Sequence, residues 1–385
     1  MRSKITVKTK EKAASYEVCV GGGALASAGK WAAASIGNPP GRVAVVSNKK
    51  VLGLYGDAVV RSLRSAGFRP EIHPIGDGES FKNLNTLNAT LEFFSSSKLA
   101  RTDSVVALGG GVVGDLAGFA ASIYLRGINY LQIPTTLLAM IDSSVGGKTA
   151  VNSTFGKNLI GSFYQPRGVL ADTETLATLP ARELTAGFCE AVKQGAIGGR
   201  KLFDQTAAFL DSIKGRKADE WTRSPDIAEG LASVLAAQIS FKARVVAGDE
   251  REAVGKLDPR SRKVLNFGHT LGHALEKVTN YRYLRHGEAV GHGICFAASL
   301  SKNLGLLAQD EVKLLYDVVH RAGPLPPIDK IDPRNVFASF KYDKKLVNES
   351  LHWILLEKVG KPVIVPHSQV PQTALMSAFK ETTRN

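Results

Sequence analysis

The chain has 385 residues, of which 44% are hydrophobic and 22% are charged, and its formal net charge is +14. This composition is that of a globular protein of about two domains, and it excludes disordered and fibrous chains. The N-terminus has no apolar run behind its charged residues, and no stretch reads as a membrane span. The three widely spaced cysteines fit neither a zinc motif nor a disulfide framework. We therefore expect a cytoplasmic protein that does not contact a membrane.

The positive charge fits either a nucleic-acid-binding protein or an enzyme that attracts an anionic substrate. Lysines and arginines are scattered along the chain, aromatic residues make up only 7%, and no nucleic-acid recognition motif is present. The densest basic patch, residues 251–263, runs directly into a segment rich in histidine. We expect a small anionic ligand and no nucleic acid. A protein that binds anions or nucleic acid without catalysis is the alternative from a different class.

The first half of the chain alternates between short apolar strands and helices. The strands are predicted at residues 16–20, 42–47, 71–75, 104–108 and 129–133. Helices are predicted at residues 51–67, 83–98 and 116–124. This alternation is typical of a parallel sheet covered by helices. The sequence therefore predicts an α/β, Rossmann-like domain over residues 1–172.

A glycine-rich loop, Gly109-Gly110-Gly111-Val112-Val113-Gly114-Asp115, follows one predicted strand and precedes a helix. In that context the loop offers bare backbone N–H groups to a pyrophosphate. The acidic residue that usually ends the next strand is missing, so the loop departs from the standard dinucleotide fingerprint. A tight turn that only packs a helix on a strand is the alternative.

A second glycine segment, Gly146-Gly147-Lys148-Thr149, resembles the end of a phosphate-binding P-loop. The first glycine of that motif is replaced by Asp142, so we reject a nucleotide triphosphatase. Polar residues are denser around this segment than a structural loop requires: Asp142, Lys148, Asn152, Lys157 and Asn158.

After residue 166 the pattern becomes mainly helical. Helices are predicted at residues 181–196, 201–213, 226–247, 266–280, 286–304 and 309–321. Residues 254–261 are expected in an exposed loop, and Asp343-Lys344-Lys345 in another. Two short strands are predicted at residues 351–356 and 363–365. We therefore expect a mainly helical domain over residues 173–385.

The helical half contains a candidate metal site. His269 and His273 are four residues apart, so they project from one face of the predicted helix. His286 follows nearby, and Glu190 places a carboxylate in an otherwise apolar helix. Two imidazoles and a carboxylate form an open coordination set for a divalent metal. Spacing alone makes His269 and His273 both ligands, whereas the structural alternative is two partly exposed histidines on a loosely packed helix.

Taken together, the ordered motifs make the chain similar to the 3-dehydroquinate synthases of the sugar-phosphate cyclase superfamily over nearly its whole length. The motifs that carry the resemblance are the glycine loop at 109–115, Arg126-Gly127, residues 133–138, residues 142–148, Asn152, residues 156–158, residues 190–193, Lys242, residues 249–251, the histidine helix, residues 286–288 and residues 343–345.

The resemblance implies that the chain has a dehydroquinate synthase-like fold and that it is a lyase. Such an enzyme converts 3-deoxy-D-arabino-heptulosonate 7-phosphate to 3-dehydroquinate and phosphate, the second step of the shikimate pathway. The reaction proceeds by transient oxidation, phosphate elimination, reduction and aldol ring closure. It uses catalytic NAD and a divalent metal, zinc or cobalt. A homodimer is the expected assembly.

The resemblance also implies roles for individual residues. It makes Glu190, His269 and His286 the metal ligands, and it moves His273 to the phosphate side of the substrate. The catalytic residues implied are Asp142, Lys148, Lys193 and His273. The residues implied to bind substrate are Arg126, Lys148, Asn158, Lys193, Lys242, Arg262, Asn266, His273 and Lys345. The residues implied to bind the cofactor are Glu79, Lys82, Gly110, Gly111, Gly114, Asp115, Thr135, Thr136, Lys148 and Lys157.

Two enzymatic alternatives remain beside this assignment. Other sugar-phosphate cyclases differ in the stretches that match residues 114–116 and 142–148. In this chain both stretches have the sequence that is typical of the dehydroquinate synthases. A metal-dependent polyol dehydrogenase shares the two-domain plan but would release NADH. The chain departs from the family by extra residues near 254–261, which lengthen the loop before Arg262.

Overall fold

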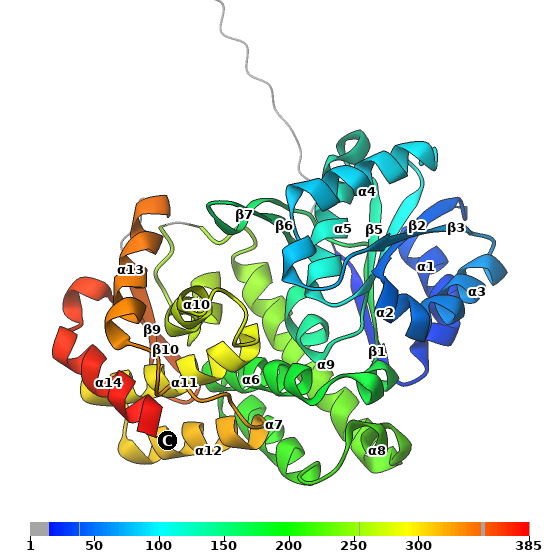
Figure 1. The fold of residues 1–385 in the computed structure, drawn as a ribbon. Helices are drawn as coiled ribbons and strands as arrows, with labels where there is room; N and C mark the ends of the chain where they lie inside the picture. Colours follow the sequence, from blue (N-terminus) through cyan, green and yellow to red (C-terminus); the bar gives the residue numbers. More distant parts are fainter. Residues whose placement is uncertain (1–14, 38, 254, 348–350, 385) are drawn as a thin grey trace, which may run out of the picture.

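The computed structural model describes residues 15–37, 39–253, 255–347 and 351–384, with the backbone alone for 341–347. Its first half is built on a sheet of six parallel strands in the order β1-β8-β5-β4-β2-β3 (Figure 1). The strands are β1 Glu17–Gly21, β2 Arg42–Asn48, β3 Arg69–Ile75, β4 Ser104–Gly109, β5 Asn129–Pro134 and β8 Gly168–Asp172. The predicted α/β, Rossmann-like half is confirmed.

Helices cover both faces of this sheet. Because successive side chains of a strand point to opposite faces, one strand contributes to both helical layers. On β2, Val43 and Val45 pack with helices α1 Ala28–Ile36 and α3 Asp57–Ser65. Ala44 and Val46 pack on the other face with helices α4 Leu84–Ser96 and α5 Gly111–Ile123. Two-sided burial explains why the central strands read as continuous apolar runs in the sequence.

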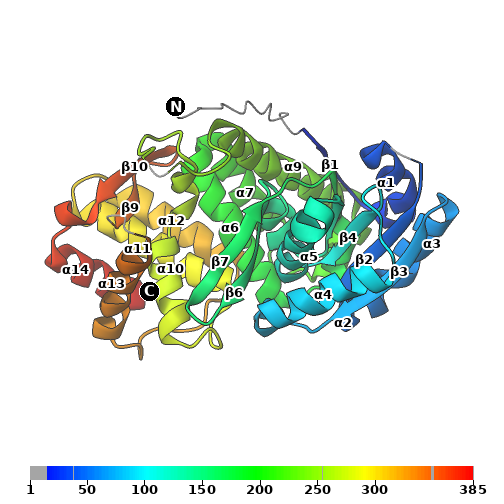
Figure 2. The same cartoon turned by 90° about the horizontal axis from the view of Figure 1, so that it is seen from above.

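A long antiparallel hairpin leaves the first half and lies beside the second. It is formed by β6 Lys148–Ser153 and β7 Gly156–Phe163. Seen from above, the hairpin lies between α10 of the helical half and α4 and α5 of the first half (Figure 2). The sequence analysis read these residues only as a polar segment, because their few apolar side chains do not form a clear strand pattern.

The second half packs helices around one large apolar core. Its helices are α6 Ala181–Gly198, α7 Arg200–Ser212, α8 Ala218–Arg223, α9 Pro225–Gly248, α10 His269–Val278, α11 His286–Asn303, α12 Gln309–Ala322, α13 Pro333–Val347 and α14 Gln372–Arg384. A hairpin of β9 His352–Lys358 and β10 Lys361–Pro366 closes it. Helix α11 is buried along almost its whole length, so it is the central helix of this half.

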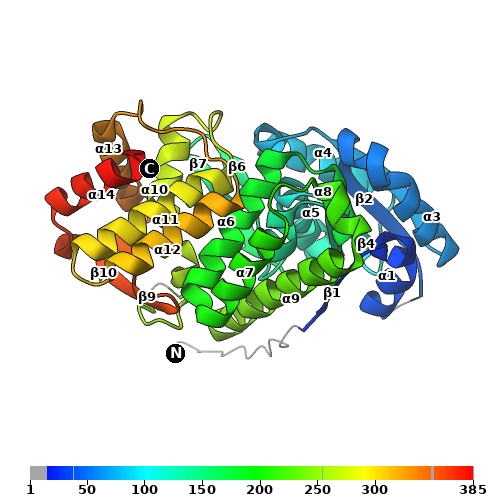
Figure 3. The ribbon, with the colours of Figure 1, turned by 90° about the horizontal axis from the view of Figure 1, so that it is seen from below.

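Helix α9 is long and apolar enough to cross a membrane by length and composition alone. In the fold it packs on α6, α7 and α8, and it also touches β1 of the sheet. Figure 3 shows it running beneath the molecule toward β1. We therefore regard α9 as a core helix that joins the two halves.

Several elements differ from the sequence prediction, and three of these differences lie near the predicted site residues. Helix α5 begins at Gly111, five residues before the predicted start at Leu116, because two glycines hid its first turn. Helix α10 begins only at His269, since Gly268 before it adopts a left-handed φ of 77° that ends the preceding 3₁₀ turn. The segment at 343–345 lies in α13 rather than in a loop, and Pro333 is a favourable first residue of that helix. The division of the chain at residue 172 stays a prediction.

Candidate active site

A cavity of about 840 Å³ opens where the carboxyl ends of the parallel strands, the β6–β7 hairpin and helices α10 and α11 meet. Ligands of open α/β sheets bind outside the carboxyl ends of the strands. The residues that line one side of the cavity follow β2, β4 and β5, and they include Asn48, Gly110 and Thr135. His273 and His286 line the opposite side. One cavity thus joins the predicted cofactor residues to the predicted metal site.

The three histidines and Glu190 lie close together. Ring nitrogens of His269, His273 and His286 lie within 4.8 Å of one another. The Glu190 Oε1 atom lies 3.7 Å from His269 Nε2 and 3.6 Å from His286 Nε2. These separations are too long for good hydrogen bonds. They are near the roughly 3.3 Å that separates neighbouring ligands in a tetrahedral site with bonds of about 2.0 Å.

The donor chemistry of the cluster also fits a divalent metal. Glu190 is 1% exposed, and its Oε1 atom has no hydrogen-bond donor among the described residues. A buried carboxylate oxygen without a partner is costly unless an ion binds it. Burial, followed by the charge of Lys193, holds the pKa of His269 well below its usual value, so its imidazole is neutral and ready to coordinate.

Outer hydrogen bonds orient two of these imidazoles. His269 Nδ1 lies 3.2 Å from the backbone oxygen of Phe267, and His286 Nδ1 lies 2.9 Å from Glu276 Oε2. In both rings an Nδ1–H that donates to this oxygen leaves Nε2 free to face Glu190. Burial opposes ionisation of Glu276, but its contacts with His286 and Lys157 lower the pKa of this carboxyl to about 2.

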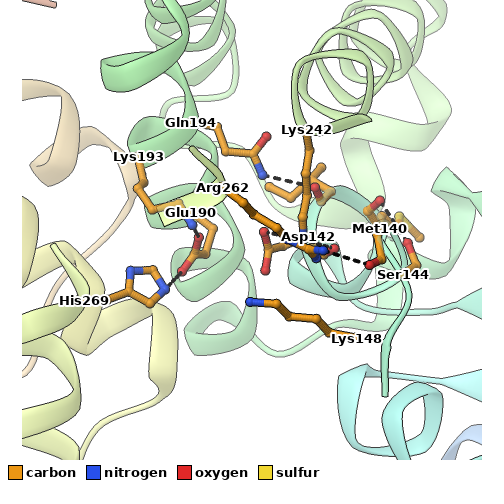
Figure 4. A network of polar contacts seen from close by, with 12 residues as sticks. Met140, Asp142, Ser144, Lys148, Glu190, Lys193, Gln194, Lys242, Arg262 and His269 are labelled. Atoms are coloured by element: carbon orange, nitrogen blue, oxygen red, sulfur yellow. Dashed lines mark hydrogen bonds and ion pairs between the residues drawn. The ribbon is translucent and has the colours of Figure 1, made fainter. Parts of the chain in front are cut away.

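A second charged network lies behind the cluster (Figure 4). Lys193 Nζ lies 2.6 Å from Glu190 Oε2, and Lys242 Nζ lies 2.8 Å from Asp142 Oδ1. Burial disfavours the charged form of Asp142, yet the ammonium groups of Lys242 and Lys193 hold its pKa well below the usual value. Burial would lower the pKa of Lys193, but Glu190 and Asp142 outweigh it and raise that pKa. The Asp142 carboxylate and the Lys193 ammonium are therefore both charged at neutral pH.

Further cations face the cavity from both halves. Arg262 is 2% exposed and donates to the backbone oxygens of Gly146 and Glu250 at 3.1 and 2.7 Å. Its Nε atom has no acceptor among the described residues. Lys148 begins β6 and forms an ion pair with Glu252, whose other oxygen lies 3.5 Å from Asn266 Nδ2. In Figure 4 the Lys148 side chain points toward the same space as the Glu190 and Asp142 carboxylates.

Several predicted cofactor residues lie at the sheet end of the cavity. Gly110 caps α5 in an extended conformation, so the first backbone N–H groups of that helix are free to bind an anion. Lys82 is 4% exposed and lies 2.5 Å from both Asp115 Oδ2 and Asn158 Oδ1. Burial raises the pKa of Asp115, although Lys82 opposes this shift. The remaining predicted cofactor residues that line the cavity are Glu79, Gly111, Thr135, Thr136, Lys148 and Lys157.

Glu190, Lys193 and His269, whose contacts are given above, lie behind the lining of the cavity, and four further predicted residues lie apart from it or have side chains outside the described part of the chain. Gly114 faces the sheet, where an added Cβ would meet Gln132 Oε1 at 2.8 Å, so it allows close packing of helix on strand. Arg126 is exposed with a left-handed φ of 65° and does not line the cavity. Asn266 reaches the site only through Glu252. Lys345 lies in α13, and its side chain is outside the described part of the chain.

Two carboxylates at the site were missed by the sequence analysis. Glu276 binds His286 and Lys157, and Glu252 binds Lys148. Glu276 could have been found, because it lies three residues after His273 and seven after His269 on the same helical face. Glu252 had no such signal, since it lies in an irregular loop with a positive φ of 51°.

Comparison with known proteins assigns the family. Residues 72–186 match the family model of the 3-dehydroquinate synthase N-terminal domain, and residues 187–346 match that of the 3-dehydroquinate synthase C-terminal domain. The chain is 42% identical over 352 residues to a 3-dehydroquinate synthase from Pelotomaculum thermopropionicum, which covers 91% of this chain and 90% of the relative.

Solved structures agree with this result. A 2-epi-5-epi-valiolone synthase from Streptomyces hygroscopicus, solved with NAD+ and Zn2+, superposes with a TM-score of 0.85 at 28% identity, covering 98% of this chain and 99% of that one. A 2-deoxy-scyllo-inosose synthase, solved with carbaglucose-6-phosphate, NAD+ and Co2+, has a TM-score of 0.77 at 27% identity and covers 96% of each chain. Fold and site thus define a sugar-phosphate cyclase. Within that class, the chain belongs to the 3-dehydroquinate synthase family.

Proposed function

We propose that this protein is a 3-dehydroquinate synthase, a lyase that converts 3-deoxy-D-arabino-heptulosonate 7-phosphate to 3-dehydroquinate and phosphate in the shikimate pathway. The observation that carries the proposal is the meeting of Glu190, His269 and His286 beside a cavity rich in lysine and arginine, in a chain that matches both domains of the family. The cofactors that this family and the related structures support are NAD and a divalent metal, Zn or Co.

The metal would be held by Glu190, His269 and His286, and NAD by the residues that follow β4 and β5. Together these groups supply the reversible oxidation of a secondary alcohol and polarise the oxygen that reacts. The chain's own residues bind and orient the substrate. His273 lines the cavity next to the metal ligands, and burial, aided by the charge of His286, lowers its pKa to about 4. We assign this neutral imidazole to the phosphate side of the substrate.

The cations would neutralise the two anionic ends of the substrate. Arg262 donates to two backbone oxygens, which hold its guanidinium in one orientation for a carboxylate or phosphate. Lys148 comes from the hairpin, whereas Lys193 and Lys242 come from α6 and α9. A substrate bound both by the hairpin lysine and by the cations of the helical half is held in one reactive conformation. This is the main requirement for an ordered series of steps on a flexible molecule. We keep Asn158, Asn266, Arg126 and Lys345 as predicted substrate contacts.

The decisive assay mixes purified protein, NAD, Co2+ and the seven-carbon phosphate, and follows both phosphate release and the ring product. We expect stoichiometric phosphate and 3-dehydroquinate with no net formation of NADH. Accumulation of NADH with a simple alcohol would favour the polyol dehydrogenase instead. Phosphate release from a different sugar phosphate alone would favour another cyclase.

The remaining expectations concern the cell and the assembly. All three cysteines, Cys19, Cys189 and Cys295, are free thiols, which fits the reducing cytoplasm that we propose. The homodimer stays a prediction, and light scattering coupled to gel filtration would test it. We assign no role in binding nucleic acid or membranes.

A further inference from the structure

One buried carboxylate contacts both a proposed metal ligand and the hairpin without being a ligand itself. The Glu276 side chain is 4% exposed and lines the cavity. Its Oε2 atom lies 2.9 Å from His286 Nδ1, and its Oε1 atom lies 3.0 Å from Lys157 Nζ. A buried carboxylate is retained at low cost only when its oxygens are paired, and here each oxygen has its own partner.

We propose that Glu276 is a positioning residue, which orients His286 toward the metal and links that ligand to the β6–β7 hairpin through Lys157. The inference rests on the proposed metal site and deepens it. When Glu276 accepts a hydrogen bond from Nδ1–H of His286, the imidazole is fixed in the tautomer whose Nε2 atom faces Glu190 at 3.6 Å. The carboxylate also makes the imidazole a stronger donor to a cation.

The second contact of Glu276 reaches across the site. Lys157 belongs to β7, and its Nζ atom lies 4.2 Å from the centre of the Tyr281 ring as well as beside Glu276. The same hairpin carries Lys148 and Asn158, which we propose to bind substrate. A change in the position of the hairpin therefore acts on Glu276, and Glu276 acts on the metal ligand.

The inference is tested by Co2+ binding to the full-length, metal-free protein, measured by competition with a chelator and by the visible d–d absorption bands. Loss of an outer-shell carboxylate typically weakens metal affinity by roughly 10- to 100-fold. We expect that loss in Glu276→Ala, together with a changed spectrum, because His286 is no longer held in one orientation. The matched control is Glu381→Gln on α14, whose carboxylate pairs with Lys302 at 2.8 Å and does not line the cavity.

A second variant guards against a folding defect. If circular dichroism shows that Glu276→Ala is unfolded, Glu276→Gln replaces it, since the amide has the same shape and lacks the charge. We expect Glu276→Gln to bind Co2+ roughly 10-fold more weakly than the parent. A folded variant that matches the parent in affinity and spectrum would overturn the role of Glu276.

The link to the hairpin is tested with Lys157→Met in the parent and in the Glu276→Ala background. We expect weaker Co2+ binding in the parent background and no further effect once Glu276 is gone, because the two residues act through one contact. Equal effects in both backgrounds would overturn the link. Failure of the parent itself to bind Co2+ would instead overturn the proposed metal site, and the inference with it.

Discussion

At the scale of single residues, both carboxylate oxygens of Glu190 face charged or ionisable groups. One carboxylate oxygen pairs with the Lys193 ammonium, and the other faces two imidazoles at distances set for a shared cation. With Lys193 at 2% side-chain exposure, neither charge has access to bulk water. In the proposed site, the charge of this residue would therefore serve both metal binding and local stability.

For Glu190→Gln we expect loss of bound metal and of turnover, with the fold retained at a lower melting temperature. The amide is a poor metal ligand, and Lys193 loses the partner that compensates its burial, which costs about 3–5 kcal/mol when a buried pair is broken. Bound metal after dialysis is measured by plasma mass spectrometry, beside circular dichroism and phosphate release. Full activity with parental metal content would contradict the assignment.

The metal-free protein should lose stability as pH falls below about 6.5. The pKa of His269 lies well below the usual 6.5 in the folded state, chiefly because of burial. Below pH 6.5 the unfolded chain binds a proton at this residue that the folded chain refuses, so acid favours unfolding by up to about 1.4 kcal/mol per pH unit.

Urea unfolding at pH 7.5 and 5.5, in the presence of a chelator, measures this loss. We expect a smaller loss in His269→Gln than in the parent. His320→Gln serves as the control, since His320 lies on the exposed side of α12. An equal loss in the parent and both variants would show that His269 does not titrate in this way.

At the scale of elements, helices α6 and α11 approach each other so closely that glycine is required between them. A Cβ added at Gly287 would lie 2.0 Å from the backbone oxygen of Ala186. Because α6 carries Glu190 and α11 begins at His286, this contact sets the distance between two proposed ligands. Arg182 reinforces it, since its guanidinium lies 2.6 and 2.5 Å from the two oxygens of the buried Glu288.

Gly287→Ala should therefore weaken both the fold and metal binding. Overpacking of a close contact costs about 1–3 kcal/mol, and the displaced helix takes His286 with it. Thermal unfolding and Co2+ affinity are measured together. Gly53→Ala is the matched control, because an added Cβ there meets no atom within 4 Å. A Gly287→Ala variant as stable as this control would disprove the close contact.

The sequence predicts elements well where one pattern dominates. Five of the six parallel strands and the helices α6, α7, α9, α10, α11 and α12 were predicted, because continuous apolar runs or helical periodicity mark them. Strand β8 and helices α1, α8, α13 and α14 were not predicted. Prediction failed where tertiary contacts decide. The hairpin β6–β7 is held by the partners of Lys157 and Asn158 across the site. The start of α10 depends on the left-handed Gly268, and an added Cβ there would meet the backbone of Ile294 at 2.9 Å.

The same distinction applies to the site. The resemblance to a known family supplied Glu190, His269 and His286, and the structure brings these three together. The spacing argument, which made His273 a ligand, remains compatible with the geometry, since this ring also lies within the cluster. Glu252 was missed, because its partner Lys148 lies 104 residues away in the chain. Glu276 also has a remote partner in Lys157, but its spacing from His269 and His273 on α10 was visible in the sequence.

At the scale of the molecule, the site is assembled across both halves. Arg262 belongs to the helical half and is anchored on Gly146 of the first half. Lys242 on α9 likewise reaches Asp142, which lies in a π-helical turn at Ala139–Ser143. These contacts join the two halves around the cavity.

For Arg262→Ala we expect substrate affinity to fall by roughly 10- to 100-fold while NAD affinity changes little. A charge-assisted hydrogen bond contributes about 1.5–3 kcal/mol, and Arg262 lies away from the glycine loop that we assign to NAD. Arg262→Lys keeps the charge without the planar donor fork and should fall between the two. Calorimetric titration with substrate and with NAD checks both; an unchanged substrate constant would remove Arg262 from the binding site.

The β6–β7 hairpin has one further consequence. It brings Lys148, Lys157 and Asn158 to the cavity from a single short stretch of chain, while the proposed metal ligands lie on three helices far along the sequence. Because Lys157 also pairs with Glu276 beside His286, exchanging the hairpin would change the predicted substrate contacts and the support of a proposed metal ligand together. We therefore expect engineered hairpins to succeed only when they keep a cation at position 157.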